Sequence, residues 1–290
     1  MSAHVILNNE FGQIQSVELG HSIKGLSLKH PFFQATVSLY GGQVLTWQPI
    51  GQQPIFWVSD NAQYVKGKAI RGGIPLCWPW FGPYKEGGNH GFARQQMWTL
   101  SETLITAENI TLVLTWRGEN QHELWTTPSE LKQELVFGEQ FSQRFFMTNL
   151  SDHPVKYTGA LHSYFAVSAP ENITIEPLST APFNDKLTDT FVEAQALTNC
   201  VGPIDRIYHS NQRVKMVDSK WQRIIEIESQ HCQQWVLWNP GKKGAALMTD
   251  VAINGEQQFV CLEAANTQWQ EIPAQSTVEM SQTIKISGRT

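Results

Sequence analysis

The sequence R-G-G-I-P-L-C-W-P-W-F-G-P-Y-K-E-G-G-N-H-G-F-A-R runs from Arg71 to Arg94 and differs in character from the text on either side. Proline fixes φ and removes a backbone donor, and glycine permits positive φ, so this stretch is incompatible with a long helix or a regular central strand. Disordered segments avoid tryptophan and phenylalanine, which are frequent here. We therefore expect an ordered loop that presents Arg71, His90 and Arg94 beside aromatic walls, which suits a sugar carrying an anionic group. In the alternative, the tryptophans fill a core and the arginines face solvent.

Outside this loop the sequence predicts strands. One strand ends at Tyr40, a turn follows at Gly41-Gly42, and a second strand runs on to Trp47. In a later predicted strand the side chains alternate between two faces, and Leu131, Gln133, Leu135 and Phe137 lie on the face expected to be buried. Similar runs occupy residues 109–116, 141–150, 155–167, 223–229, 234–238, 259–264 and 276–286, while brief helices are expected near 59–65 and 197–204. The pattern predicts an all-β fold, a large antiparallel β-sandwich forming one domain over residues 1–290.

Bulk properties exclude several classes of function. The net charge of -5 argues against nucleic acid as a partner, because binding to the phosphate backbone requires a positive surface. No apolar run is long enough for a membrane span and no secretory signal begins the sequence, so we expect a cytoplasmic protein, acting as a monomer on a small molecule. The four cysteines form no C-x-x-C pair and have no histidines at zinc-site spacing, so no metal is expected. Motifs for nucleotide cofactors are also absent from the sequence, so no cofactor is expected.

Three ionisable residues stand out, two of them within predicted strands and the third, Asp205, on a predicted loop that leads into a strand. Glu263 interrupts the apolar run F-V-C-L-E-A-A-N, and because a buried glutamate needs a partner, it should line a cavity or pair with a cation. His162, in G-A-L-H-S-Y-F-A-V, is either a hydrogen-bonded core residue or a catalyst. Asp205, in G-P-I-D-R-I-Y, either forms a turn after proline or belongs to the site. A histidine and a carboxylate are what a proton-shuttling isomerase needs, since one removes a proton while the other donates one.

Five runs of the chain, taken in order, resemble the aldose 1-epimerase (mutarotase) family, in its branch that acts on hexose 6-phosphates. They are R-G-G-I-P-L-C-W-P-W-F-G-P, N-H-G-F-A-R, L-H-S-Y-F, P-I-D-R-I-Y and C-L-E-A-A-N. The first of these is the most specific, and the resemblance covers essentially the whole chain. It implies the galactose-mutarotase-like β-supersandwich, with an active site open across one sheet.

The resemblance also implies roles at matching positions. His162 would be the general acid that protonates the ring oxygen, and Glu263 the general base that takes the anomeric hydroxyl proton. Asp205 would contact the sugar and orient or tune the histidine. His90, Arg94 and Arg71 would line the substrate cleft, and the two arginines would hold the phosphate of a sugar phosphate.

Two alternatives to a hexose-phosphate epimerase remain open at this point. A free-hexose epimerase would leave Arg71 and Arg94 without an anionic partner. A non-catalytic carbohydrate-binding or sugar-phosphate-sensing protein would have no need of the pair His162 and Glu263. Trp78, Trp80, Phe81 and Trp238 could either stack on the sugar or fill the core.

Overall fold

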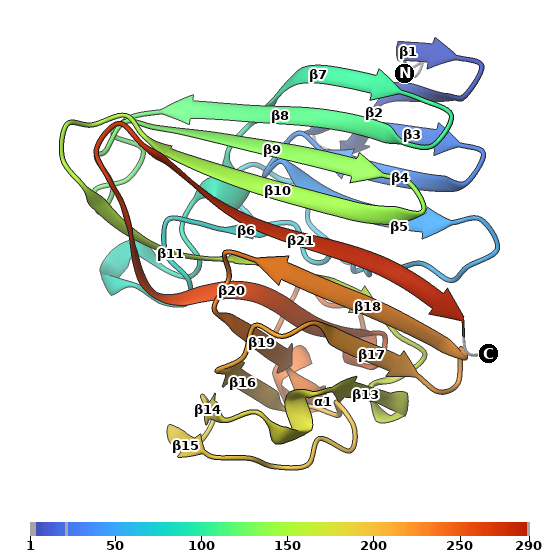
Figure 1. Cartoon of the computed structure of the whole chain (residues 1–290), viewed down its shortest axis with the longest axis vertical. Coiled ribbons are helices and arrows are strands. Elements are labelled where there is room, and N and C mark those ends of the chain that lie inside the picture. The colour runs from blue at the N-terminus through green and yellow to red at the C-terminus, as the bar shows by residue number, and fades with distance from the viewer. Residues whose placement is uncertain (1–3, 21–22, 289–290) are drawn as a thin grey trace.

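The computed structural model describes residues 4–20 and 23–288, and most of its regular structure is antiparallel β-strand (Figure 1). The first five strands form a sheet in sequence order. They are β1 (His4–Asn9), β2 (Gly12–Gly20), β3 (Ile23–His30), β4 (Phe33–Ser38) and β5 (Gln43–Pro49). The predicted turn between β4 and β5 is confirmed, with Gly41 and Gly42 at φ values of 79° and 57°.

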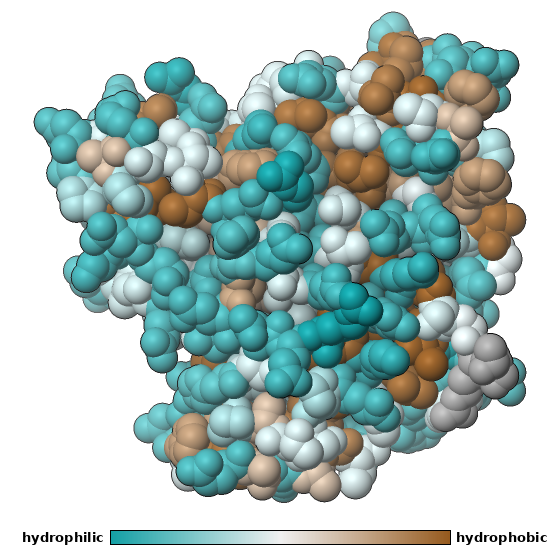
Figure 2. All heavy atoms as spheres, in the orientation of Figure 1, coloured by the Kyte–Doolittle hydropathy of each residue, from teal (hydrophilic) through white to brown (hydrophobic). Residues whose placement is uncertain are grey.

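A second sheet has eight strands, which Figure 1 shows from β7 at the top to β13 near the bottom. In spatial order they are β13 (Ile173–Glu176), β17 (Val214–Asp218), β18 (Arg223–Gln230), β21 (Thr277–Gly288), β10 (Gln140–Asn149), β9 (Ser129–Phe137), β8 (Ile110–Gly118) and β7 (Thr99–Ile105). Alternate residues of β8 and β9 are buried, so one face of the sheet meets the core. The opposite face carries ion pairs of Arg144 with Glu134 and Glu279, and Figure 2 shows largely hydrophilic side chains over this sheet.

The third sheet carries most of the candidate active site. Its path is β15 (Thr190–Val192), β14 (Phe183–Asp185), β16 (Ile204–Tyr208), β19 (Gln234–Asn239), β20 (Phe259–Ile272), β11 (Val155–Leu161) and β6 (Leu76–Cys77), with β12 (Tyr164–Ala166) also paired to β20. One continuous apolar core joins the three sheets through residues such as Trp47 of β5, Phe141 of β10 and Leu262 of β20. The prediction of an all-β antiparallel fold is confirmed.

Helices are few and short among the described residues. They are α1 (Gly241–Ala245) and the 3-10 turns η1 (Lys85–Gly87), η2 (Ala93–Gln95), η3 (Pro170–Asn172), η4 (Leu178–Thr180) and η5 (Gly255–Gln257). None of the helices in these ranges is long and apolar enough to cross a membrane.

The helices predicted at 59–65 and 197–204 are wrong. In the first segment the Ser59 hydroxyl accepts the Asn61 N–H, which makes a turn rather than the start of a helix. In the second, Gly202-Pro203 leads directly into β16, and a following proline disfavours helical geometry at the preceding residue.

The segment from Arg71 to Arg94 is an ordered loop, as predicted. Trp78 and Trp80 are each 1% exposed and belong to the core, which settles the alternative for these two side chains. Gly73 has a φ of 62°, and a Cβ added there would collide with the carbonyl oxygen of Val44. The loop therefore lies tightly against β5, and this close approach fixes the course of the backbone at Arg71.

Candidate active site

Glu263 lies in the middle of β20, which runs between β19 and β11. Its register partner on β19 is Val236, so its side chain shares a face with that apolar residue. The side chain is 1% exposed. The sequence anomaly is therefore real: a carboxyl group is buried in the centre of a sheet.

His162 occupies the short connection between β11 and β12. Its backbone N–H donates to the Pro75 carbonyl (3.1 Å), which ties this connection to the loop of residues 71–94. The ring stacks on Tyr164, with centroids 4.8 Å apart and planes at 11°, and meets the Trp238 ring edge-on at 6.2 Å. These contacts place His162 Nε2 3.3 Å from Glu263 Oε1. The two residues singled out in separate strands thus meet directly.

Burial favours the neutral form of both members of this pair. It raises the pKa of Glu263 well above its ordinary value, and the nearby charge of Asp205 adds to that shift while Arg94 opposes it. Burial also lowers the pKa of His162, and His90 and Arg94 lower it further. A neutral imidazole with a protonated carboxyl holds as many protons as an imidazolium with a carboxylate. The pair can therefore pass a proton from one group to the other without changing its net charge.

His90 and Arg94 reach the same place from the loop. The His90 ring lies 5.5 Å from the His162 ring, and its Nδ1 accepts the Gly82 N–H (3.1 Å). Burial, with the two site arginines, lowers the pKa of His90 to about 3, so this ring is neutral with its proton on Nε2. Arg94 donates through Nη2 to the Asn89 carbonyl (2.8 Å). No carboxylate of the described ranges pairs with Arg94.

Arg71 is held more firmly than Arg94. Its Nη1 donates to the Tyr164 hydroxyl (2.7 Å) and its Nε to Asp250 Oδ2 (3.1 Å). Burial lowers the pKa of Arg71, but Tyr164 and Asp250 outweigh burial and the net shift is upward, so the guanidinium stays charged. Because Tyr164 stacks on His162, the arginine and the histidine are joined through one aromatic ring.

Three of these residues bury a polar atom that has no hydrogen-bond partner within the described part of the chain. The atoms are His162 Nδ1, Glu263 Oε2 and Arg94 Nε. Leaving a buried polar group unpaired costs about 1–3 kcal/mol. Such groups are rare in native proteins, and two of these three atoms belong to the acid–base pair itself.

Comparison with known proteins shows the family to which the chain belongs. The sequence model of the family described as aldose 1-epimerase matches residues 24–287. The chain belongs to the aldose 1-epimerase family. A relative from Escherichia coli, named "Putative glucose-6-phosphate 1-epimerase", is 31% identical over 270 residues, which cover 90% of this chain and 89% of the relative. A relative of the same name from Cenchrus ciliaris is 28% identical, over 80% of this chain and 74% of its own length.

Solved structures of aldose 1-epimerase relatives share the fold. The crystal structure of a "putative mutarotase" from Salmonella typhimurium superposes with a TM-score of 0.89 at 26% identity, covering 99% of this chain and 97% of the other. A galactose mutarotase-like protein from Clostridium acetobutylicum gives a TM-score of 0.74 at 13% identity, covering 97% and 100%. The expected galactose-mutarotase-like β-supersandwich is confirmed.

Asp205 lies apart from the other predicted site residues of this aldose 1-epimerase family member. It is half-buried on β16, opposite Trp238 of β19. Since β16 and β20 both pair with β19, Asp205 and Glu263 are two strands and two residues apart, about 12 Å. No hydrogen bond or ion pair between described residues joins Asp205 to His162. Its charge acts instead on Glu263, while burial raises its own pKa.

Sequence reasoning missed two residues of this site. Tyr164 stands in the quoted run L-H-S-Y-F, so its place two residues after His162 could have drawn attention to it. Asp250 carries no such signal, because it is 179 residues from its partner Arg71 and lies in the loop after α1. Among the aromatic candidates, Phe81 packs against His90 (5.1 Å) and Trp238 against His162, and both remain half-buried at the site.

The described residues contain no group of three or more His, Cys, Asp or Glu side chains arranged to hold a metal ion. Cys77 and Cys261 lie near the acid–base pair but are fully buried. Burial, as the main cause, raises the pKa of both thiols. They are therefore not thiolate nucleophiles at neutral pH.

Proposed function

We propose that this protein interconverts the α and β anomers of a hexose 6-phosphate, with glucose 6-phosphate as the expected substrate. The observation that carries the proposal is the buried pair of His162 and Glu263, with Nε2 and Oε1 3.3 Å apart. Membership of the aldose 1-epimerase family supports the reaction class. The name of the Escherichia coli relative supports the phosphorylated substrate.

The reaction needs two proton transfers, one at each of the two oxygens bonded to C1. Glu263, as the carboxylate, takes the proton of the hydroxyl at C1, and His162, as the imidazolium, gives a proton to the ring oxygen. The C1–O5 bond breaks and an open-chain aldehyde forms. Rotation about C1–C2 presents the other carbonyl face, and reclosure with the reverse transfers gives the other anomer and restores both residues. Each positioned acid or base contributes about 10²–10⁴-fold.

The closeness of the two residues suits this chemistry. Both oxygens that exchange protons are bonded to C1, so the acid and the base must act side by side rather than from opposite ends of the sugar. The contact between His162 and Glu263 meets that requirement. Asp205, two strands away, is placed to contact a hydroxyl group farther around the ring, and Trp238 lies between them on β19.

The two arginines are the proposed phosphate ligands. A guanidinium matches phosphate oxygens with paired N–H donors, and such charge-assisted hydrogen bonds are about twice as strong as neutral ones. Arg94 lacks a carboxylate partner among the described residues, so no protein anion balances its charge there. Arg71 would share its guanidinium between the phosphate and Asp250, which already contacts it.

One observation favours a second candidate, a free-hexose aldose 1-epimerase. The ion pair with Asp250 already neutralises Arg71, so a phosphate is not needed to balance its charge. The non-catalytic alternative has no comparable support, since a binding protein gains nothing from a buried acid–base pair that raises the cost of folding.

Saturation-exchange NMR tests the proposal, because it measures anomer exchange of glucose 6-phosphate and glucose in the presence and absence of protein. We expect the protein to accelerate exchange of glucose 6-phosphate more than that of glucose, and His162→Asn to remove nearly all of the effect while circular dichroism stays unchanged. Equal acceleration of both sugars would favour the free-hexose candidate. Full activity in His162→Asn would remove the proposed acid.

A further inference from the structure

Four glutamines are buried in the core between the sheets. Gln43, Gln133, Gln143 and Gln282 are each at most 1% exposed. Gln43 begins β5, and the other three lie in the second sheet on β9, β10 and β21, where Gln143 is the register partner of Gln282. Amides so completely buried stay in a fold only when hydrogen bonds satisfy them, so their bonds need to be accounted for.

Three of these glutamines form a chain of hydrogen bonds across the second sheet. Gln282 Nε2 donates to Gln143 Oε1 (2.9 Å), and Gln143 Nε2 donates to Gln133 Oε1 (2.7 Å). Gln133 Nε2 then donates to the Gly42 carbonyl (2.6 Å), next to Gln43. We call this set, with Gln43, the glutamine ladder. Its members lie on four different strands, β5, β9, β10 and β21, so it links separate parts of the fold.

One end of the ladder reaches the proposed acid. Gln282 Nε2 also donates to Ser163 Oγ (3.0 Å), and Ser163 follows His162 in the chain. The Ser163 carbonyl accepts the Leu262 N–H (3.1 Å), and Leu262 precedes Glu263. Ser163 is 0% exposed, and it joins the backbone at His162 to the strand that carries Glu263. A shift of this residue would therefore move the imidazole relative to the carboxyl group.

The other end brackets one of the proposed phosphate ligands. Gln43 Nε2 donates to the carbonyls of Ile70 (3.2 Å) and Gly72 (2.6 Å), the residues on either side of Arg71. The Oε1 atom of Gln43 is buried and has no partner in the described ranges. An apolar side chain would avoid the cost of this unpaired oxygen. The amide is therefore explained by the two hydrogen bonds that its nitrogen donates.

We propose that the glutamine ladder is a positioning network that fixes the His162–Ser163 connection and the Arg71 backbone relative to each other. This inference rests on the proposed function of His162 and Arg71. Networks of satisfied buried hydrogen bonds rigidify the groups they join. A displacement of about 1 Å at a reacting group costs about 10²-fold in rate. The second sheet thus contributes to catalysis without touching the substrate.

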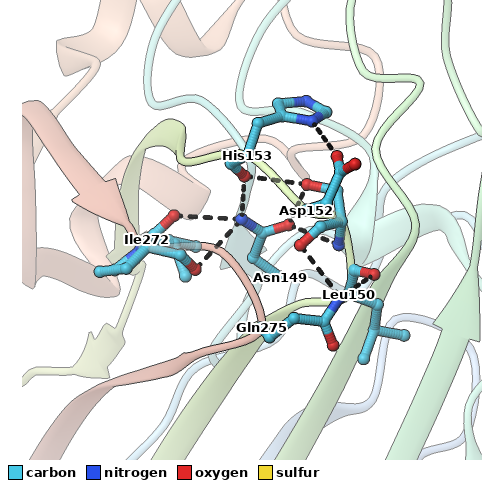
Figure 3. A network of polar contacts seen from close by, with 8 residues as sticks. Asn149, Leu150, Asp152, His153, Ile272 and Gln275 are labelled. Carbon is cyan, nitrogen blue, oxygen red and sulfur yellow. Dashed lines mark hydrogen bonds and ion pairs between the residues drawn. The ribbon is translucent and has the colours of Figure 1, made fainter.

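Gln143→Met tests the ladder at its centre, because methionine keeps the shape of the side chain and breaks both links. Asn149→Leu is a matched control on the same strand, β10. Asn149 is 1% exposed, and its Nδ2 donates to the carbonyls of His153 (2.8 Å), Ile272 (3.2 Å) and Pro273 (3.2 Å) (Figure 3). This second network is nine residues from Glu263 along β20, about 30 Å at the rise of a strand.

We expect Gln143→Met to lower kcat about 10- to 100-fold at a temperature where both variants are fully folded. Asn149→Leu should lower the melting temperature about as much as Gln143→Met does and leave kcat unchanged. Gln143→Glu should restore kcat while its buried carboxyl is protonated, since that group supplies the one donor and one acceptor that Gln143 uses. Such rescue does not follow from a general loss of stability.

Several outcomes would overturn the ladder. Wild-type kcat in Gln143→Met, an equal kcat loss in Asn149→Leu, or no rescue by glutamate would each do so. If Gln143→Met does not fold, Ser163→Ala leaves the glutamines intact and removes the hydroxyl that bonds Gln282. This variant should also lower kcat, and unchanged kcat there would refute the proposal. His162→Asn separates the two proposals: its full activity would overturn the function, whereas an inactive His162→Asn with an unaffected Gln143→Met would overturn the ladder alone.

Discussion

Replacing Glu263 with glutamine should have opposite effects on activity and on stability. The substitution keeps the size of the side chain and removes its ability to take a proton. No other carboxylate contacts His162 among the described residues, and Glu263 is 1% exposed, so neither a neighbour nor bulk water is placed to substitute for it. We therefore expect kcat to fall toward the upper end of the range for a general base, about 10³–10⁴-fold.

The effect on stability follows from the direction of the pKa shift. Burial raises the pKa of Glu263, so the folded protein holds this proton more tightly than the unfolded chain does. Stability from this group is present below the unfolded pKa, about 4.3, and is lost as pH rises toward the higher folded value. Glutamine does not ionise. Glu263→Gln should therefore melt at about the wild-type temperature near pH 4 and several degrees above it near pH 7.

Saturation-exchange NMR with glucose 6-phosphate gives the rate, and thermal unfolding monitored by circular dichroism at the two pH values gives the stability. His162→Asn is a useful comparison, because it should lose a similar share of activity without the same pH-dependent gain in melting temperature. The reasoning would be refuted by a Glu263→Gln rate within about 10-fold of wild type. A variant that is destabilised at pH 7 relative to pH 4 would contradict the assigned direction of the shift.

Three further predictions concern charge at the site. Arg94→Ala should lower kcat/KM for glucose 6-phosphate about 10- to 100-fold and kcat/KM for glucose far less, and Arg71→Ala should act in the same direction. Arg144→Ala, on the outer face of the second sheet, is the control and should change kcat/KM for neither sugar. Equal losses on both sugars would exclude phosphate binding by these arginines. Asp250→Asn should lower KM for glucose 6-phosphate in steady-state assays, because it frees Arg71 from its counter-ion, and a raised KM would show that Asp250 positions the arginine instead. The kcat at saturating substrate should stay constant across neutral pH. The raised pKa of Glu263 and the lowered pKa of His162 widen the pH range in which the pair holds one exchangeable proton. A narrow bell-shaped pH profile of kcat between the ordinary pKa values of the two groups would contradict this.

Local patterns explain why the strands could be predicted. Alternation over Leu131, Gln133, Leu135 and Phe137 reports which face of β9 is buried, and each position can be judged from its near neighbours. Gln133 even falls in register with the apolar residues, which marks it as facing the core. The two short helices were predicted wrongly because a helical pattern over so few residues is weak evidence. A hydroxyl–backbone hydrogen bond at Ser59 and a proline at position 203 favour other structure there.

The candidate site, too, could be predicted from the sequence only in part. Glu263 and His162 could be singled out because an ionisable residue in an apolar strand is anomalous wherever it occurs. Their 3.3 Å contact depends on strand order in the third sheet, which no local pattern encodes. The pairing of Arg71 with Asp250 is equally hidden, since it joins a loop near β5 to the loop after α1. Single residues can be nominated from the sequence, whereas their pairings come from the fold.

A crystal structure of Glu263→Gln with glucose 6-phosphate tests the central claim most directly, because the inactive variant would hold the substrate. We predict the C1 hydroxyl within hydrogen-bond distance of the residue 263 amide, the ring oxygen facing His162, and the phosphate in contact with Arg94. A sugar bound with its phosphate beside His162, or at a site that does not include this pair, would contradict the account.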